Sequence, residues 1–118
     1  MKKPLVSILM NCFNGERYLK ESIDSALKQT YKNWELVFWD NQSSDKSAKI
    51  FKSYSDSRLK YYLAPNHSKL GEARKRAFKY LKGEFVAVLD VDDIWYSHKL
   101  ERQIQYFSDS ETGIVICN

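Results

Sequence analysis

Three aspartates stand close together in the segment 89–93, Leu-Asp-Val-Asp-Asp. They follow the apolar run Phe85–Leu89, which predicts a buried strand. Like charges this close repel one another, and a hard divalent cation such as Mg²⁺ or Mn²⁺ would relieve the repulsion because it prefers oxygen ligands. Asp90, Asp92 and Asp93 therefore predict a divalent-cation site. A solvated acidic turn before the next helix is the alternative interpretation.

Alternating strands and helices would have to position these acids. Apolar runs predict the strands, and amphipathic runs at helical spacing predict the helices between them. Ser43 or Ser44 is expected to cap the second helix. The predicted strands are Leu5–Met10, Glu35–Asp40, Leu59–Leu63, Phe85–Leu89 and Gly113–Cys117, and the predicted helices contain Leu19–Leu27, Ile50–Tyr54, Gly71–Leu81 and Trp95–Phe107.

This alternation predicts an α/β fold, an open and mostly parallel Rossmann-like sheet with helices on both faces. Right-handed crossovers then bring the carboxyl ends of all strands to one edge. Asn11, Asp40 and Asp90 are expected to end the first, second and fourth strands, so they should meet at that edge. If the first strand neighbours the fourth, the crevice between them is a topological switch point, where such sheets bind ligands.

Composition limits the class of protein. The chain has 118 residues, enough for one domain, and its 43% hydrophobic and 14% aromatic content argues against disorder. A net charge of +4 with 15 acidic residues does not indicate nucleic acid. The two cysteines, Cys12 and Cys117, are expected to be reduced thiols. The start of the chain resembles no signal peptide, and no apolar run is long enough to cross a membrane.

Several kinds of site are excluded by what the sequence lacks. The chain has only four glycines and contains neither a Gly-x-Gly-x-x-Gly loop nor a Gly-x-x-x-x-Gly-Lys phosphate cradle. It has no Gly-x-Ser-x-Gly nucleophile motif. His67 and His98 are not spaced as a metal pair and are expected to be exposed. A receiver domain needs an acidic pair after the first strand, where this chain has the segment 11–14, Asn-Cys-Phe-Asn.

Short motifs follow one another along essentially the whole chain. They are Val6–Asn14, Tyr18–Ser25, Gln29–Tyr31, Glu35–Asp45, Gly71–Lys75 and Gly83–Asp93. Several ordered motifs at matching spacing are far more specific than any one of them. Together they resemble the N-terminal half of an inverting family 2 glycosyltransferase with the GT-A fold, including its Gln-Thr-Tyr, Gly-x-Ala-Arg and Asp-x-Asp-Asp segments.

The resemblance implies roles for the residues that follow the first two strands. Asn11, Cys12 and Phe13 would line the nucleotide pocket. Asp40 and Asn41 would face the base and ribose of a nucleotide-sugar donor. Asn41 stands where the family usually has a second Asp, and an amide can both donate and accept hydrogen bonds. The resemblance therefore leaves room for a base preference that differs from the family's usual one.

The resemblance also implies roles for residues farther along the chain. Arg74 would lie near the donor phosphates, with a solvated helix charge as the alternative. Asp90 and Asp92 would contact the nucleotide sugar, and Asp92 and Asp93 would hold Mn²⁺ or Mg²⁺. Such a cation stabilises the negative charge of a departing diphosphate. In this family the general base that activates the acceptor hydroxyl lies in the C-terminal half, and we expect it beyond Asn118.

We therefore expect residues 1–118 to be a single nucleotide-sugar-binding domain, cut from a longer enzyme of polysaccharide biosynthesis and itself weakly active or inactive. The expected partners are a nucleotide-diphosphate sugar and an acceptor glycan or lipid-linked sugar. We expect a cytoplasmic location, at the inner face of the membrane if the protein is peripheral, and self-association through an exposed sheet edge. A non-catalytic nucleotide-binding or assembly module is the alternative. A nucleic-acid-binding face on the third helix is disfavoured, because acidic residues balance its lysines and arginines.

Overall fold

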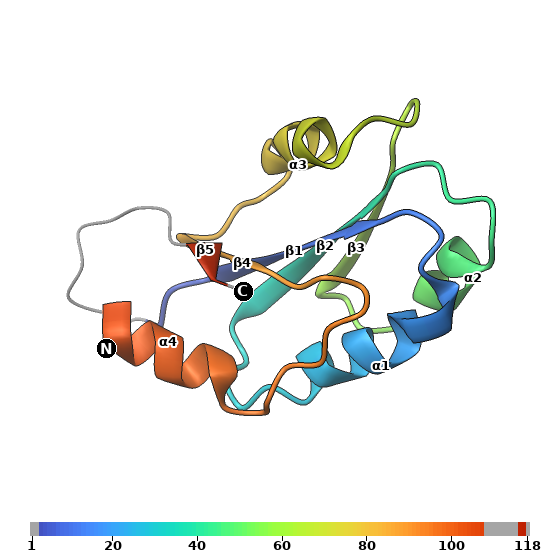
Figure 1. Ribbon diagram of the computed structural model, residues 1–118. Coiled ribbons are helices and arrows are strands. Elements are labelled where there is room, and N and C mark those ends of the chain that lie inside the picture. The colour runs from blue at the N-terminus through green and yellow to red at the C-terminus, as the bar shows by residue number, and fades with distance from the viewer. Residues whose placement is uncertain (1–2, 108–115, 118) are drawn as a thin grey trace.

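The sheet contains five parallel strands in the order β3-β2-β1-β4-β5, in a computed structural model that describes residues 3–107 and 116–117 (Figure 1). This confirms the predicted α/β class. The strands are β1 (Val6–Cys12), β2 (Trp34–Asp40), β3 (Leu59–Leu63), β4 (Phe85–Val88) and β5 (Ile116–Cys117), and the helices are α1 (Glu16–Leu27), α2 (Ser47–Lys52), α3 (Leu70–Phe78) and α4 (Lys99–Phe107).

Helices cover both faces of the sheet, as the sequence predicts. Helices α1, α2 and α4 lie on one face and α3 lies on the other (Figure 1). Successive side chains of a strand point to opposite faces, so Ile8 and Met10 pack toward α1 whereas Leu9 packs toward α3. Ala73 and Ala77 are fully buried, which lets α3 approach the sheet closely.

Several element boundaries differ from the predictions: β1 and β2 begin at Val6 and Trp34, β4 ends at Val88, and α2 ends at Lys52, before Tyr54. Strand β1 continues through Asn11 to Cys12, because β2 offers it ladder partners as far as Asp40. Helix α3 ends at Phe78, where the next backbone hydrogen bonds tighten to three-residue spacing. Trp95 lies outside α4, although its side chain is only 7% exposed and joins the core from the preceding segment.

Two smaller predictions also change. Neither Ser43 nor Ser44 caps α2, which begins after Lys46 without a side-chain cap. Strand β5 is described only at Ile116–Cys117, and the rest of its predicted span lies outside the described residues.

Strand β1 lies between β2 and β4, which places a switch point at the centre of the sheet. From β1 the chain adds β2 and β3 on one side, and then it crosses to add β4 and β5 on the other side. The connections after β1 and after β4 therefore run toward opposite edges of the sheet, and a crevice is expected at the carboxyl ends of these two strands. The condition that the sequence left open, that the first strand neighbours the fourth, is met.

A polar network fixes the opposite, amino-terminal edge of the sheet. Glu35 is buried, and its carboxylate accepts hydrogen bonds from Ser7 Oγ at 2.6 Å, from the Lys82 backbone N–H at 2.6 Å and from Lys60 Nζ at 2.9 Å. Ser7 Oγ in turn accepts the Gly83 N–H at 2.7 Å. The network joins β1, β2 and β3 to the turn before β4, so it sets where the fourth strand enters the sheet.

Gly83→Ala is expected to lower the free energy of unfolding by about 2–3 kcal/mol, because overpacking a fixed backbone is costly. A Cβ at this position would lie 2.6 Å from the Ser7 backbone nitrogen and 2.7 Å from the Leu5 carbonyl oxygen. Gly71→Ala is the matched control, since a Cβ there meets nothing within 4 Å. Urea denaturation followed by circular dichroism measures both; equal midpoints for the two variants would contradict the prediction.

Candidate active site

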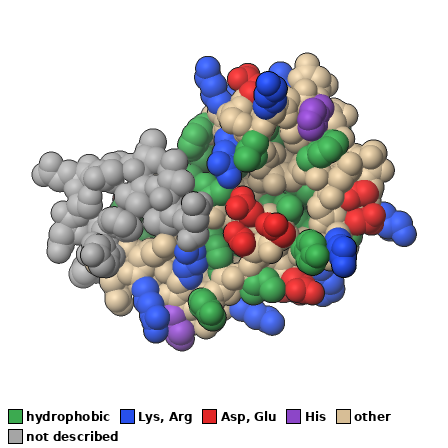
Figure 2. All heavy atoms as spheres, viewed as in Figure 1, with side chains coloured by type: hydrophobic (Ala, Val, Ile, Leu, Met, Phe, Trp, Pro, Cys, Tyr) green, Lys and Arg blue, Asp and Glu red, His purple; other side chains and the backbone are tan. Residues whose placement is uncertain are grey.

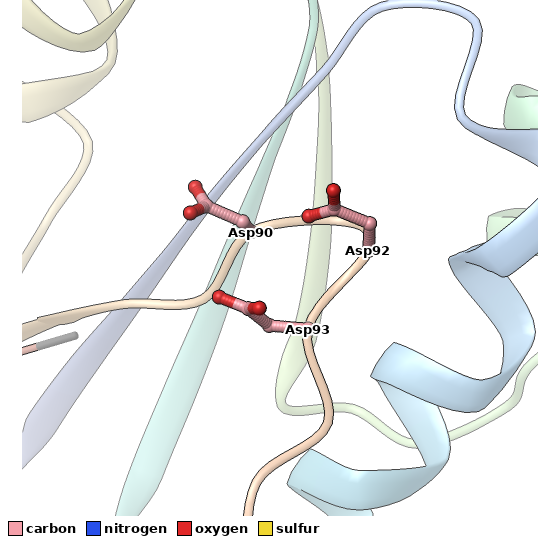
Figure 3. A group of neighbouring side chains, drawn as sticks. All are labelled: Asp90, Asp92 and Asp93. Atoms are coloured by element: carbon pink, nitrogen blue, oxygen red, sulfur yellow. The ribbon is translucent and has the colours of Figure 1, made fainter.

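The three aspartates lie together in the loop that follows β4. One carboxylate oxygen from each of Asp90, Asp92 and Asp93 lies within 4.8 Å of the others, and all three residues are exposed. Figure 3 shows the carboxylates of Asp92 and Asp93 turned back toward that of Asp90. Figure 2 shows acidic side chains gathered near the middle of the face that it draws. The predicted cluster is therefore present and open to a ligand.

The backbone of this loop is held from two sides. Leu89 N–H still donates to the Leu9 carbonyl, which continues the pairing with β1. The Asp90 carbonyl accepts hydrogen bonds from the Asp93 N–H and from Ser22 Oγ of α1, each at 3.0 Å. A tight turn thus places the acids at the carboxyl edge of the sheet, and α1 anchors that turn.

Gln29 ties down the chain that leaves the acidic loop. Its side chain is fully buried, and Nε2 donates to the carbonyls of Tyr96 at 2.7 Å and Ser25 at 3.2 Å. Its Oε1 accepts the Leu100 N–H at 3.1 Å. The amide therefore joins the end of α1 to the start of α4. The Gln-Thr-Tyr motif marked this position in the sequence, but not the contacts that it makes.

Arg74 reaches the acidic loop from α3. Its guanidinium Nη2 lies 3.5 Å from Asp90 Oδ1, and both side chains are partly exposed. An ion pair of this kind contributes little to stability. Its buried Nε has no hydrogen-bond partner among the described residues. The structure therefore places a cationic group beside the carboxylates, and the predicted contact with donor phosphates remains a prediction.

Cys12 and Phe13 lie at the end of β1, at the carboxyl edge of the sheet. Cys12 is a buried free thiol, and burial raises its pKa, which makes it a packing residue rather than a nucleophile. Phe13 is 51% exposed, although it follows a buried strand. The half-buried Asn11 has an Oδ1 atom that is buried and lacks a hydrogen-bond partner in the described part of the chain. Asn11 thus has a hydrogen-bond acceptor at the site that no described residue uses.

The loops after β1 and β2 are joined by hydrogen bonds. Asn14 has a positive φ of 53°, a conformation that asparagine tolerates, and its Oδ1 accepts the N–H groups of Ser44 at 2.7 Å and Asp45 at 3.3 Å. The Asn14 N–H donates to Ser43 Oγ at 2.9 Å, and the Gly15 N–H donates to Ser47 Oγ at 3.0 Å. The two loops therefore form one unit at the carboxyl edge.

Asp40, at the end of β2, stabilises the joined loops through hydrogen bonds. It is only 1% exposed, and its carboxylate accepts hydrogen bonds from the Ser43 N–H at 2.8 Å and from the Tyr61 hydroxyl. Burial, and then the neighbouring carboxylate, raise the pKa of Tyr61, so the phenol keeps the proton that it donates. Asp40 thus shapes the loop after β2. Its contact with a nucleotide stays a prediction.

Asn41 connects β2 to the loop before α3. Its Nδ2 donates to the Ser68 carbonyl at 2.7 Å, and its Oδ1 accepts the Ser68 N–H at 3.0 Å. In the same loop, the ring of His67 packs against Phe13 with 4.4 Å between the ring centroids. The sequence prediction identified His67 only as an exposed loop residue, and no sequence signal links it to a partner so far away.

The structure brings the predicted residues to one edge in two groups. The first group lies at the carboxyl ends of β1 and β2, and the second follows β4 with Arg74 beside it; β1 and β4 are adjacent strands. The first group consists of Asn11, Cys12, Phe13, Asp40 and Asn41, and the second of Arg74, Asp90, Asp92 and Asp93.

Comparison with known proteins agrees with this arrangement. The family model for glycosyl transferase family 2 matches residues 7–118. The chain is 47% identical over 100 residues to the Escherichia coli UDP-Glc:alpha-D-GlcNAc-diphosphoundecaprenol beta-1,3-glucosyltransferase WfgD, covering 85% of this chain and 40% of that protein. An uncharacterized glycosyltransferase of Rickettsia typhi is 40% identical over 97% of this chain and 36% of its own length.

Solved structures with the same fold are also known. Staphylococcus aureus TarS (1–349) in complex with UDP-GlcNAc superposes with a TM-score of 0.83 at 28% identity, over 88% of this chain and 31% of TarS. The Pyrobaculum calidifontis mannosyltransferase PcManGT superposes with a TM-score of 0.84 over 92% of this chain and 34% of its own, and at 21% identity it supports the fold alone. The chain thus spans 40% or less of the length of these four proteins.

Proposed function

Because the chain belongs to glycosyl transferase family 2, we propose that it binds the diphosphate of a nucleotide-sugar donor together with a divalent cation. The observation that carries the proposal is the group of three exposed carboxylates within 4.8 Å of one another, beside the switch point between β1 and β4. The complete protein would transfer the sugar to an acceptor hydroxyl with inversion.

The acidic cluster suits Mn²⁺ or Mg²⁺, because both cations prefer hard oxygen ligands and the cluster offers only carboxylates. Asp92 and Asp93 would hold the cation, while Asp90 forms an ion pair with Arg74. When bound, the cation would neutralise negative charge on the diphosphate leaving group. Arg74 would add a second positive charge beside the same phosphates.

The loops after β1 and β2 would receive the nucleoside. Their exposed aromatic side chain, Phe13, and the free polar capacity of Asn11 lie at the carboxyl edge, where open α/β sheets bind ligands. The hydrogen bonds between Asn14 and the segment 43–45 hold these loops in one conformation before a ligand arrives. Such preorganisation lowers the entropic cost of binding.

Two of the named proteins, WfgD and TarS, support a UDP-sugar as the donor. WfgD is a UDP-Glc-dependent enzyme that acts on a lipid-linked acceptor, and TarS has been solved with UDP-GlcNAc. We propose a UDP-sugar and a lipid-linked or glycan acceptor for the protein to which this chain corresponds, as in polysaccharide biosynthesis. The general base is assigned to the part of the relatives that this chain does not cover.

Calorimetric titration of the chain with UDP, with and without Mn²⁺, tests the proposal. We expect binding that needs the cation, because the diphosphate and the three carboxylates repel each other without it. Mg²⁺ should substitute, and Na⁺ at equal ionic strength serves as the control for screening. Equal UDP affinity with and without the divalent cation would refute the metal-dependent site.

In the described part of the chain, every helix is too short or too polar to cross a bilayer. The predicted cytoplasmic location, peripheral membrane contact and self-association through a sheet edge stay predictions.

A further inference from the structure

We infer that His67, packed on Phe13 and positioned by Asn41, recognises the nucleobase of the donor. The inference rests on the proposed donor-binding function and adds to it the residue that reads the base. It follows from the change at position 41, where an amide replaces the carboxylate that the family resemblance leads one to expect there.

The Asn41 side chain is already engaged within the protein. The residue is 4% exposed, and its amide both donates to the Ser68 carbonyl at 2.7 Å and accepts from the Ser68 N–H at 3.0 Å. A carboxylate could accept from the N–H but could not donate to the carbonyl, and it would repel that oxygen. Asn41 is therefore a positioning residue for the loop before α3, and because it is buried, little of its side chain is accessible to a base.

The same loop presents His67 with a defined tautomer. His67 Nδ1 lies 3.0 Å from the Asn41 backbone carbonyl oxygen. A carbonyl oxygen only accepts hydrogen bonds, so Nδ1 carries the hydrogen and the neutral ring keeps Nε2 as an acceptor. His67 is exposed, which leaves its ring accessible to a ligand. The backbone and the side chain of Asn41 thus fix both the loop and the ring that it carries.

The position of His67 fits the base of a bound nucleotide. Phe13 is 51% exposed, and its ring lies 4.4 Å from that of His67 at an interplanar angle of 58°. Neighbouring strands lie about 4.8 Å apart, so β2 is about 10 Å from the acidic loop of β4 across β1. A diphosphate at the acids would direct the nucleoside toward this aromatic pair, and bases stack on aromatic side chains.

The test compares UDP and inorganic diphosphate, each titrated with Mn²⁺ into the wild-type chain and three variants. His67→Ala and Asn41→Asp are each expected to weaken UDP binding about tenfold. The first removes the ring that contacts the base, and the second displaces the loop that carries this ring. Neither should change the affinity for inorganic diphosphate, which has no base. His98→Ala replaces the other exposed histidine and is the matched control.

A second measurement uses only the wild-type chain, so its result does not depend on whether a variant folds. Imidazole ¹⁵N spectra of the wild-type chain should show the Nε2 signal of His67 moving on addition of UDP but not of inorganic diphosphate, with the His98 signals unchanged. UDP binding that is unaltered by His67→Ala, or tightened by Asn41→Asp, would overturn this inference alone. A wild-type chain that binds no nucleoside diphosphate would overturn the proposed function together with it.

Discussion

The double variant Asp92→Asn/Asp93→Asn is expected to lose at least about a hundredfold in Mn²⁺-dependent UDP affinity. Removal of an outer-shell partner of a metal ligand already costs about 10- to 100-fold, and this change removes two proposed ligands themselves. The single variants separate the two roles, since the residue that contacts the cation directly should account for most of the loss. Calorimetry with UDP at fixed Mn²⁺ measures all three.

Folding of the double variant should be unaffected or improved. The acids are exposed and close together, so neutralising two of them removes repulsion from the folded state. Glu84→Gln is a suitable control, because it neutralises an exposed carboxylate just before β4, at the other end of the strand. A double variant that binds UDP with Mn²⁺ as tightly as the Glu84→Gln control would show that these carboxylates hold no cation.

Glu35→Gln is expected to lower the free energy of unfolding at pH 7 by roughly 2–4 kcal/mol, somewhat less than for a fully buried ion pair because Lys60 is partly exposed. The carboxylate accepts three hydrogen bonds, from Ser7, Lys60 and the Lys82 N–H. A glutamine can keep the two bonds made at Oε2, but it would turn an amide donor toward the Lys60 ammonium. Urea denaturation measures the loss, with Glu21→Gln on the exposed side of α1 as the control.

The effect of Glu35→Gln should depend on pH. Burial alone would raise the pKa of Glu35, but hydrogen bonds from Ser7 and the Lys82 N–H, with the Lys60 ammonium, outweigh it and hold the pKa below the usual 4.5. A depressed pKa stabilises the fold above the unfolded-state value, and this contribution is lost as the pH falls through the folded-state value. The difference between wild type and variant should therefore shrink below about pH 4.5; a difference that is constant down to pH 3 would contradict this assignment.

Patterns within one element predicted the fold well. The apolar runs located all five strands, and the alternation of strands and helices gave the parallel sheet with two covered faces. The same patterns misplaced boundaries where packing overrides local preference. Asn11 looked like a strand end, yet its backbone pairs with β2. Trp95 precedes apolar residues at helical spacing, Leu100, Ile104 and Phe107, yet it reaches the core from the irregular segment before α4, because burial of a side chain does not specify its backbone.

The sequence predicted the aspartates of the candidate site, but not the long-range hydrogen bonds that position them. Asp90, Asp92 and Asp93 are neighbours in sequence, and their position after an apolar run was enough to group them. Contacts between distant segments carry no such signal: Asn41 with Ser68, or Ser22 with the Asp90 carbonyl across 68 positions. These depend on strand order and loop shape, which a single sequence does not encode in any local pattern.

The joined loops after β1 and β2 also limit how this protein can be re-engineered. Asn14 and Gly15 of the first loop depend on Ser43, Ser44 and Ser47 for their hydrogen bonds. A transplant of one loop from a relative would leave the recipient's other loop with donors and acceptors that no longer match. Chimeras designed to exchange donor preference should therefore carry both segments together, as a single cassette inherited from one parent.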